Sequence, residues 1–200
     1  MKMLLRLLLL LLVSLPAMGA TPPPDDVVRS VTDEVMQAVQ KSEELKSGER
    51  DAVIALLQQK VLPHVDFREA TRLALGRDWR IATPAQRDQL VQQFQLLLLR
   101  IYTSSIGHYH GQKMEVQRTK VPAGADDVTV RNRYLSPGHP PVSVDYAMHL
   151  TPQGWKIYDV VVDGVSIVLA FRTEFAQVVR QSGIDGLLAR LTEKNQPARP

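Results

Sequence analysis

The sequence of 200 residues contains no cysteine, which excludes several kinds of chemistry at once. Disulfide bonds and cysteine nucleophiles are impossible, and so is a lipid anchor attached through an N-terminal cysteine. A domain of this length without disulfides must be held together by its hydrophobic core. No linker or shift in composition divides the chain, and no internal repeat occurs at a fixed period, so we expect one domain.

The sequence also lacks the motifs that identify common enzyme classes. It has no phosphate-binding loop, no glycine-rich dinucleotide motif and no HExxH, and the segment 164–168 lacks the second glycine of a nucleophile elbow. His108 and His110 could present two imidazoles to a metal ion, but no carboxylate or third histidine lies close to them in sequence. We therefore expect no metal, no cofactor and no catalytic residue.

Residues 1–20 have the features of a cleavable secretory signal. Lys2 and Arg6 form the charged region, an apolar run follows to Leu15, and 17–20 are mostly small residues suited to cleavage. An uncleaved membrane anchor is the less favoured interpretation, because the apolar run is shorter than the about 20 residues that span a bilayer. Without the two leader cations the formal charge falls from +3 to +1, so charge gives no indication of nucleic-acid binding.

We expect the mature chain to be soluble, with a single domain over 21–193 and a disordered tail over 194–200. Helices come first. The expected helices begin at Asp25 or Asp26, near Gly48, at Asp66 with Glu69 in a capping box, and at Thr83-Pro84.

The helix that begins at Thr83 has an unusually broad apolar surface. Its main stripe consists of Leu90, Val91, Phe94, Leu97, Leu98, Ile101 and Tyr102, and Leu96 and Leu99 widen it. The helix is either a central core helix or a helix of which one part lines a cavity.

Beyond Gly111 the apolar period changes to two, which predicts strands. The expected strands are 114–121, 128–134, 142–150 and 155–162, forming an antiparallel meander. After the Asp163-Gly164 turn, Ser166 is expected to cap a helix that breaks at Gly183 and is followed by a short helix capped by Asp185. The order predicts an α+β fold with the helices packed on one face of a four-stranded sheet, and with Arg131, Arg133, Asp145 and His149 on the wet face.

Two polar features leave alternatives open. Asp159 is expected on the same side of its strand as Trp155, Ile157 and Val161, where it is either a general base or, as we favour, a structural carboxylate that accepts hydrogen bonds. Arg68, Arg72, Arg77 and Arg80 could meet a phosphate or an acidic partner. A solvated face is favoured for them, because Asp66, Glu69 and Asp78 are interspersed.

Several segments together resemble the MlaC (toluene-tolerance) family of auxiliary proteins of lipid-transporting ABC systems. They are VLPHVDF at 61–67, ALGRDW at 74–79, ATPAQR at 82–87, YDVVVDGVS at 158–166 and GIDGL at 183–187. They follow the family order over nearly the whole mature chain, with Asp163 where glutamate is more usual.

The resemblance implies a periplasmic phospholipid carrier of a Gram-negative envelope, with phospholipid as cargo. Its partners would be an MlaA-like outer-membrane lipoprotein with its porin and the MlaD-like ring of an inner-membrane ABC transporter, and it would maintain outer-membrane lipid asymmetry as a monomer. The family fold is a twisted four-stranded antiparallel sheet with helices on one face and an apolar pocket between them. A small-molecule enzyme that uses Asp159 or a histidine, and a lipid-free envelope adaptor, remain the alternatives.

The alternation of the strands and the stripe of the long helix predict which residues line the pocket. They are Phe67, Leu97, Leu98, Ile101 and Tyr102 from the helices, and Val128, Val130, Val144, Tyr146 and Met148 from the strands.

Overall fold

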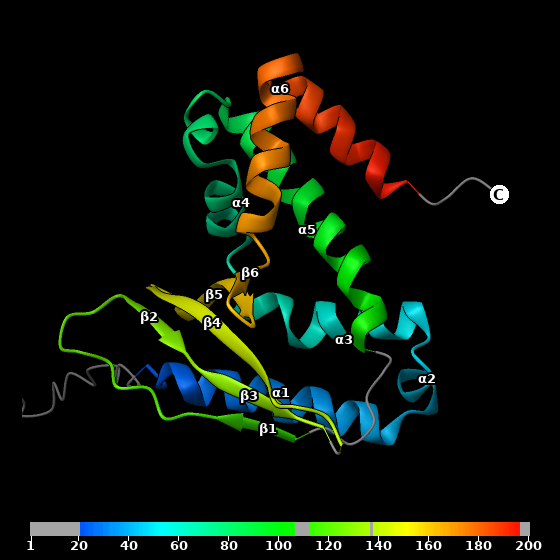
Figure 1. Cartoon of the computed structure of the whole chain (residues 1–200), viewed down its shortest axis with the longest axis vertical. Coiled ribbons are helices and arrows are strands. Elements are labelled where there is room, and N and C mark those ends of the chain that lie inside the picture. Colours follow the sequence, from blue (N-terminus) through cyan, green and yellow to red (C-terminus); the bar gives the residue numbers. More distant parts are fainter. Residues whose placement is uncertain (1–20, 107–112, 137, 197–200) are drawn as a thin grey trace, which may run out of the picture.

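The computed structural model describes residues 21–106, 113–136 and 138–196, and Figure 1 shows them as helices gathered beside and above an antiparallel sheet. The expected signal, His108, His110 and 197–200 lie outside these residues. The helices are α1 (Pro24–Lys41), α2 (Glu43–Lys46), α3 (Arg50–Lys60), η1 (Leu62–His64), α4 (Phe67–Leu75), η2 (Gly76–Arg80), α5 (Pro84–Ile106), η3 (Leu169–Phe171) and α6 (Arg172–Asn195). In the described part of the chain, no helix has both the length and the hydropathy needed to cross a membrane.

The expected α+β class is confirmed, but the sheet has six strands instead of four. The strands are β1 (Lys113–Val116), β2 (Asp127–Val130), β3 (Asn132–Leu135), β4 (Val142–Thr151), β5 (Gly154–Val162) and β6 (Val165–Ser166). Their order is β1-β3-β4-β5-β6, and β2 also pairs with β4. The expected strand 128–134 is divided because the side-chain amide of Asn132 donates to the carbonyls of Val130 and Val144, which interrupts regular pairing.

A bulge in β5 changes which residues share a face of the sheet. Ala147 pairs with Asp159 but Met148 pairs with Ile157, so Tyr158 is an extra residue. Cross-strand partners lie on the same face, and Asp159 is therefore on the opposite face from Ile157. The expectation that these two side chains share a side is wrong, because strict alternation does not allow for the extra residue.

The capping signals in the sequence were good guides to most helix starts. Asp66 accepts a hydrogen bond from the Glu69 amide (2.9 Å), and Thr83 and Gln86 form a reciprocal capping box. Two expected starts are wrong. Proline 24 occupies the first turn of α1, which puts Asp25 and Asp26 inside the helix. Ser166 belongs to β6 and caps η3 through the Leu169 amide, so α6 begins only at Arg172.

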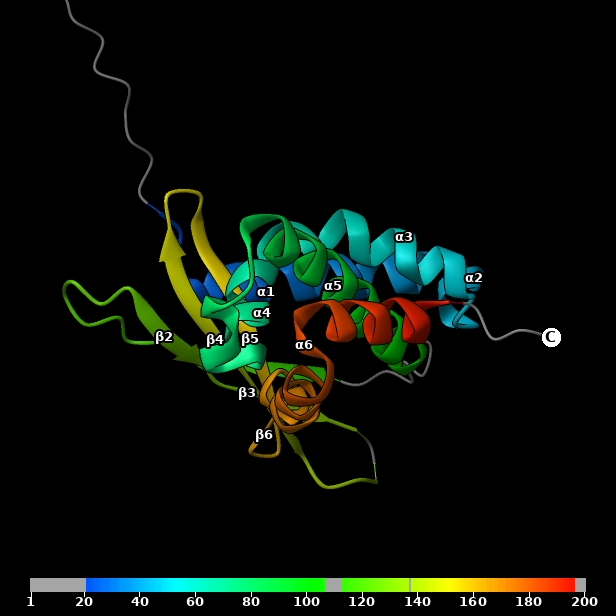
Figure 2. The same ribbon diagram turned by 90° about the horizontal axis from the view of Figure 1, so that it is seen from above.

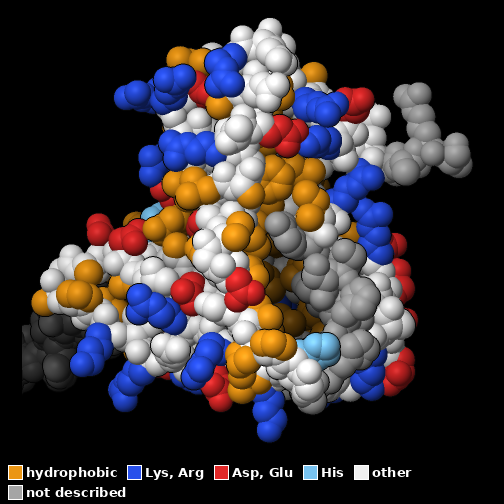
Figure 3. Space-filling view, in the orientation of Figure 1, with side chains coloured by type: hydrophobic (Ala, Val, Ile, Leu, Met, Phe, Trp, Pro, Cys, Tyr) orange, Lys and Arg blue, Asp and Glu red, His pale blue; other side chains and the backbone are white. Residues whose placement is uncertain are grey.

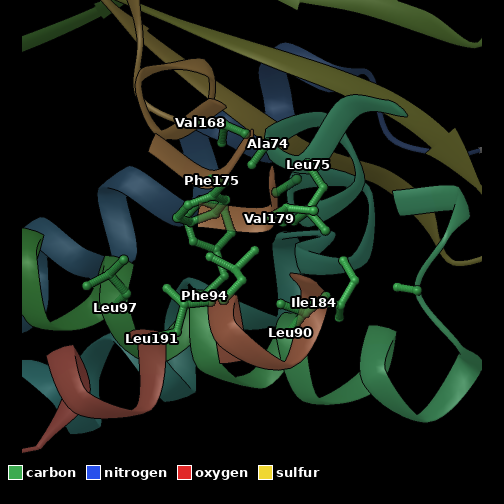
Figure 4. Close-up of a cluster of buried hydrophobic side chains, with 13 residues drawn as sticks. Ala74, Leu75, Leu90, Phe94, Leu97, Val168, Phe175, Val179, Ile184 and Leu191 are labelled. Carbon is green, nitrogen blue, oxygen red and sulfur yellow. The ribbon is translucent and has the colours of Figure 1, made fainter. Parts of the chain in front are cut away.

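The buried side chains form three separate clusters. The first lies between α4, α5 and α6 and includes Phe94, Phe175 and Leu187 (Figure 4). The second joins α1 to the sheet through Val28, Val130 and Met148, and the third joins α1, α2 and α3. Figure 2 shows β2 and the β4–β5 hairpin on one side of the molecule, and α2, α3 and the end of α6 on the other.

The kink in α6 depends on Gly183, whose φ of 69° and ψ of −171° lie in a region that side chains other than glycine avoid. We expect Gly183→Ala to lower the free energy of unfolding by about 1 to 3 kcal/mol, measured by urea denaturation. Nothing lies within 4 Å of an added Cβ, so the cost comes from the backbone alone.

The neighbouring substitution Ser182→Ala is the control for Gly183→Ala. Ser182 is exposed and has helical backbone, so the change should stay below about 0.5 kcal/mol. Wild-type stability of Gly183→Ala would show that residue 183 does not need this conformation.

Candidate apolar binding site

An apolar cavity of about 210 Å³ lies where α3, η1, α4 and α5 meet β5 and the segment that follows it. Its lining consists of Leu57, Val61, Leu62, Val65, Phe67, Ala70, Leu98, Leu99, Ile157, Tyr158, Asp159, Val160, Ile167 and Val168. Figure 3 shows hydrophobic side chains around a hollow between the upper helices and the sheet. The arrangement suits an apolar ligand, because almost all the lining side chains are aliphatic or aromatic.

The helical wall of the cavity follows from the spacing of apolar residues. Leu57 and Val61 are four residues apart on and just after α3, and Phe67 and Ala70 are three apart on α4, so each pair lies on one side of its helix. Leu98 and Leu99 come from the broad apolar surface of α5. Another part of the same surface, with Phe94 and Leu97, is buried in the core between α5 and α6. The helix is therefore a core helix along one part and a cavity wall along another.

The other wall is the edge of β5, whose backbone polar groups are satisfied by neighbouring segments. The Asp66 amide donates to the Ile157 carbonyl (2.8 Å), and the Ile167 amide donates to the Val160 carbonyl (2.8 Å). Val65 forms an isolated parallel bridge with Ile157. An apolar ligand can approach this edge without stripping water from unpaired carbonyls.

Asp159 organises the segment after β5. Its side chain is 6% exposed, Oδ1 accepts from the amides of Val160 (2.8 Å) and Val168 (3.1 Å), and the Ser166 hydroxyl donates to Oδ2 (2.5 Å). Both carboxylate oxygens face donors of the following turn. The geometry thus agrees with the structural carboxylate that the sequence favoured over a general base.

A polar network joins the helices to the sheet beside the cavity. Asp66 Oδ2 lies 3.0 Å from His149 Nε2, and the His149 ring contacts the Tyr158 ring edge to face. The Tyr158 hydroxyl donates to Asp127 (2.8 Å). Burial, together with Asp127, raises the pKa of Tyr158 to about 12. The His149 side chain, which we expected on the wet face, is half-buried and contacts Asp66 and Tyr158.

The structure brings only some of the sequence-predicted lining residues to the cavity. Phe67 and Leu98 line it. The strand residues Val128, Val130, Tyr146 and Met148 pack in the cluster that joins α1 to the sheet. Leu97 is buried between α5 and α6 (Figure 4).

Three further predicted residues lie elsewhere. Val144 is half-buried opposite Val162, and Ile101 is 41% exposed. Tyr102 belongs to α5, but its side chain lies outside the described part. In the described residues, no group of three potential metal ligands comes together, and the histidine pair expected at 108 and 110 is outside them.

Sequence reasoning missed the cavity residues of α3, η1 and β5. A signal was present, because 155–162 is apolar on both alternating faces. A strand of this kind packs against other elements on both faces, and one of these faces can line a cavity. The helix stripe at Leu57 and Val61 was visible too. Only the fold shows that both meet α5.

Comparison with known proteins gave consistent matches over most of the chain. Residues 29–193 match the family model described as MlaC protein. The chain is similar to the toluene tolerance protein ttg2D of Pseudomonas putida, with 27% identity over 96% of this chain and 93% of that protein. It is also similar to the intermembrane phospholipid transport system binding protein MlaC of Haemophilus influenzae, with 21% identity over 89% of this chain and 85% of that protein.

One solved structure with the same fold was determined with a ligand. It is the phospholipid-binding protein from Ralstonia solanacearum in complex with a phospholipid. The two structures superpose with a TM-score of 0.80 and 31% sequence identity, covering 87% of this chain and 97% of the other.

Removal of the Asp159 carboxylate should loosen the wall of the cavity. We expect Asp159→Ala to lower the free energy of unfolding by about 2 to 4 kcal/mol, because it leaves the buried Val168 amide and the half-buried Ser166 hydroxyl without their acceptor. Urea denaturation measures this loss, and hydrogen exchange should show faster exchange at the Val168 amide.

The matched control for Asp159→Ala is Asp33→Ala, which removes an exposed carboxylate from α1 and should change stability by less than about 0.5 kcal/mol. Equal effects of the two substitutions would contradict the assigned role of Asp159.

Proposed function

The chain belongs to the MlaC family, and we propose that it is a periplasmic carrier that binds phospholipid and shuttles it between complexes of the outer and inner membranes. The apolar cavity is the observation that carries the proposal, since a relative with the same fold and 31% identity was solved in complex with a phospholipid. In this function the chain would maintain the lipid asymmetry of the outer membrane.

The free energy of hydration explains why such a carrier is needed. At about 0.8 kcal/mol for each methylene, the transfer of two acyl chains with about 30 methylenes into water costs on the order of 24 kcal/mol of free energy. A phospholipid therefore does not cross an aqueous compartment unaided, and a carrier must offer comparable apolar burial.

The cavity must enlarge to hold a whole phospholipid. Its 210 Å³ lies below the about 300 to 1,000 Å³ of ordinary ligand sites. Val160 lines it and pairs with Tyr146, and Val162 pairs with Val144, so these strand residues continue the same face of the sheet. We place the acyl chains along this face and under α5, which keeps the predicted residues Val144 and Tyr146 in the proposed lining.

The environment of Tyr146 suits this placement. Burial raises the pKa of the Tyr146 hydroxyl well above its usual range, with Tyr134 as its hydrogen-bond neighbour. The hydroxyl therefore stays neutral beside the acyl chains at any physiological pH. The remaining predicted residues, Phe67, Leu97, Leu98, Ile101, Tyr102, Val128, Val130 and Met148, stay in the proposed lining of the enlarged site.

Membership of the family also supports the two envelope complexes as partners. These are an MlaA-like outer-membrane lipoprotein with its porin and the MlaD-like ring of an inner-membrane ABC transporter. The carrier would work as a monomer and without a chemical step.

Lipid content tests the carrier function directly. We expect near-stoichiometric phospholipid in the organic extract of the mature protein purified from a Gram-negative periplasm, measured by mass spectrometry beside the native mass. A lipid-free native mass without detergent would contradict the proposal.

Substitutions test the proposed position of the acyl chains. We expect Leu98→Glu and Tyr146→Glu to lower the bound phospholipid at least about tenfold, because an unpaired carboxylate in an apolar site costs several kcal/mol. Circular dichroism would verify folding of each variant.

The control is Val165→Glu, which introduces the same charge at a side chain that is 64% exposed, and it should keep its lipid. A folded Leu98→Glu variant with full lipid content would remove Leu98 from the site, and the same outcome for Tyr146→Glu would remove Tyr146.

A further inference from the structure

The surface around η2, at the far end of α4 from the cavity, carries a concentration of arginine. Arg77 and Arg80 belong to η2, Ile81 follows them, and the Arg172 guanidinium lies over Gly76, with its Nη2 2.6 Å from the position of an added Cβ. We call these side chains, Arg77, Arg80, Ile81 and Arg172, the arginine tip. Figure 3 shows Lys and Arg side chains at this end of the molecule, with some Asp and Glu side chains among them.

Two of the acidic residues that could neutralise the arginine tip are engaged elsewhere. Asp66 caps α4 and contacts His149, and Glu69 pairs with Arg72. Asp78 lies in η2 itself and forms an ion pair with the tip, with its Oδ1 3.9 Å from Arg77 Nε. Of the three interspersed acids, Asp78 alone pairs with the tip, and it leaves Arg80 and Arg172 without an ion pair among the described residues.

The charge of the tip contrasts with the rest of the chain. Within the described residues, no carboxylate forms an ion pair with Arg80 or Arg172. The mature chain, in contrast, has 22 basic and 21 acidic residues once Lys2 and Arg6 are removed with the leader. An almost neutral protein thus presents a cationic surface at one end.

The tip rests on an ordered platform. The Trp79 ring has Arg68 at 5.8 Å and Arg87 at 5.2 Å from its centre. Arg87 also donates to the carbonyls of Trp79 (3.0 Å) and Arg80 (3.3 Å), which fixes η2 against α5. Such preorganisation lowers the entropy lost on binding.

The tip has the anatomy of a protein-docking surface. Ile81 is 67% exposed and directly follows Arg80 in the chain, so an exposed apolar side chain comes next to the cationic ones. Arginine presents a planar fork that matches carboxylates. A single aliphatic side chain offers little area for insertion into a bilayer, so the observations favour a protein.

We propose that the arginine tip docks the carrier on an acidic face of a protein partner. The inference rests on the proposed function, because it takes the partner to be one of the two envelope complexes. The cavity and the tip lie at opposite ends of α4, so a partner could hold the tip without covering the cavity lining at Phe67.

The test compares the variant Arg77→Glu/Arg80→Glu with the charge-matched control Arg118→Glu/Lys120→Glu, which changes exposed residues of another surface. Binding to the purified ring protein and to the purified lipoprotein–porin complex would be measured by interferometry at low and high ionic strength. We expect the tip variant to weaken binding to at least one of them by about tenfold or more at low ionic strength, and the control by less than about twofold. The substitution Ile81→Ser should also weaken binding to the same protein.

Binding to vesicles of anionic phosphatidylglycerol would be measured as well. Three results would overturn the proposal: wild-type affinity of the tip variant for both proteins, equal losses of affinity in tip variant and control, or a loss of affinity for the vesicles alone. The lipid content of each variant, measured in parallel, should stay at the wild-type level. Lipid-free wild-type protein would contradict the carrier function, while the affinities would still decide the role of the tip.

Discussion

The apolar character of the cavity depends on hydrogen bonds that other segments form with the backbone along its β5 wall. A sheet edge exposes carbonyl and amide groups, and leaving them unpaired beside apolar side chains costs free energy. Here the Asp66 amide donates to the Ile157 carbonyl, and the Ile167 amide donates to the Val160 carbonyl. The Asp159 carboxylate accepts from the Val168 amide. The residues that follow β6 and the entry to α4 therefore satisfy polar backbone groups of β5 at the cavity, which keeps the cavity apolar.

The position of the cavity follows from the three hydrophobic clusters. Its lining draws on all of them, with Ala70 from the α4–α6 cluster, Val65 from the cluster of α1 and the sheet, and Leu99 from the cluster of α1, α2 and α3. The space is the junction between packed units rather than a hole inside one. Separation of two units can enlarge it with less loss of packing than a void inside a single close-packed core would require.

Local signals predicted much of the fold. The capping boxes at Asp66 and Thr83, the break at Gly183 and the change of period after Gly111 all have short-range physical causes, and the structure contains them. The errors in the sheet came from irregularities in strand pairing. Asn132 divides one strand, and an extra residue at Tyr158 reverses the faces of β5. Neither feature changes the spacing of apolar residues in the sequence.

The candidate site was harder to predict than the fold, because the lining of a cavity depends on which apolar surfaces remain incompletely covered. Leu97 and Leu98 are adjacent on the same broad helix surface, yet the first is core and the second lines the cavity. Only the crossing of α5 with α6 and α3 distinguishes them.

The fold-back of α6 at Gly183 covers an apolar surface that no earlier cluster covers. Its two arms complete the cluster of α4 and α5, Asn195 donates to the Gln93 carbonyl, and Lys194 closes on Glu174. The elements α1, α2 and α3 bury a cluster of their own without α6, whereas the part of α5 with Leu90, Phe94 and Leu97 depends on α6 for its cover. A chain without residues 172–195 would therefore expose this apolar surface and be prone to aggregate.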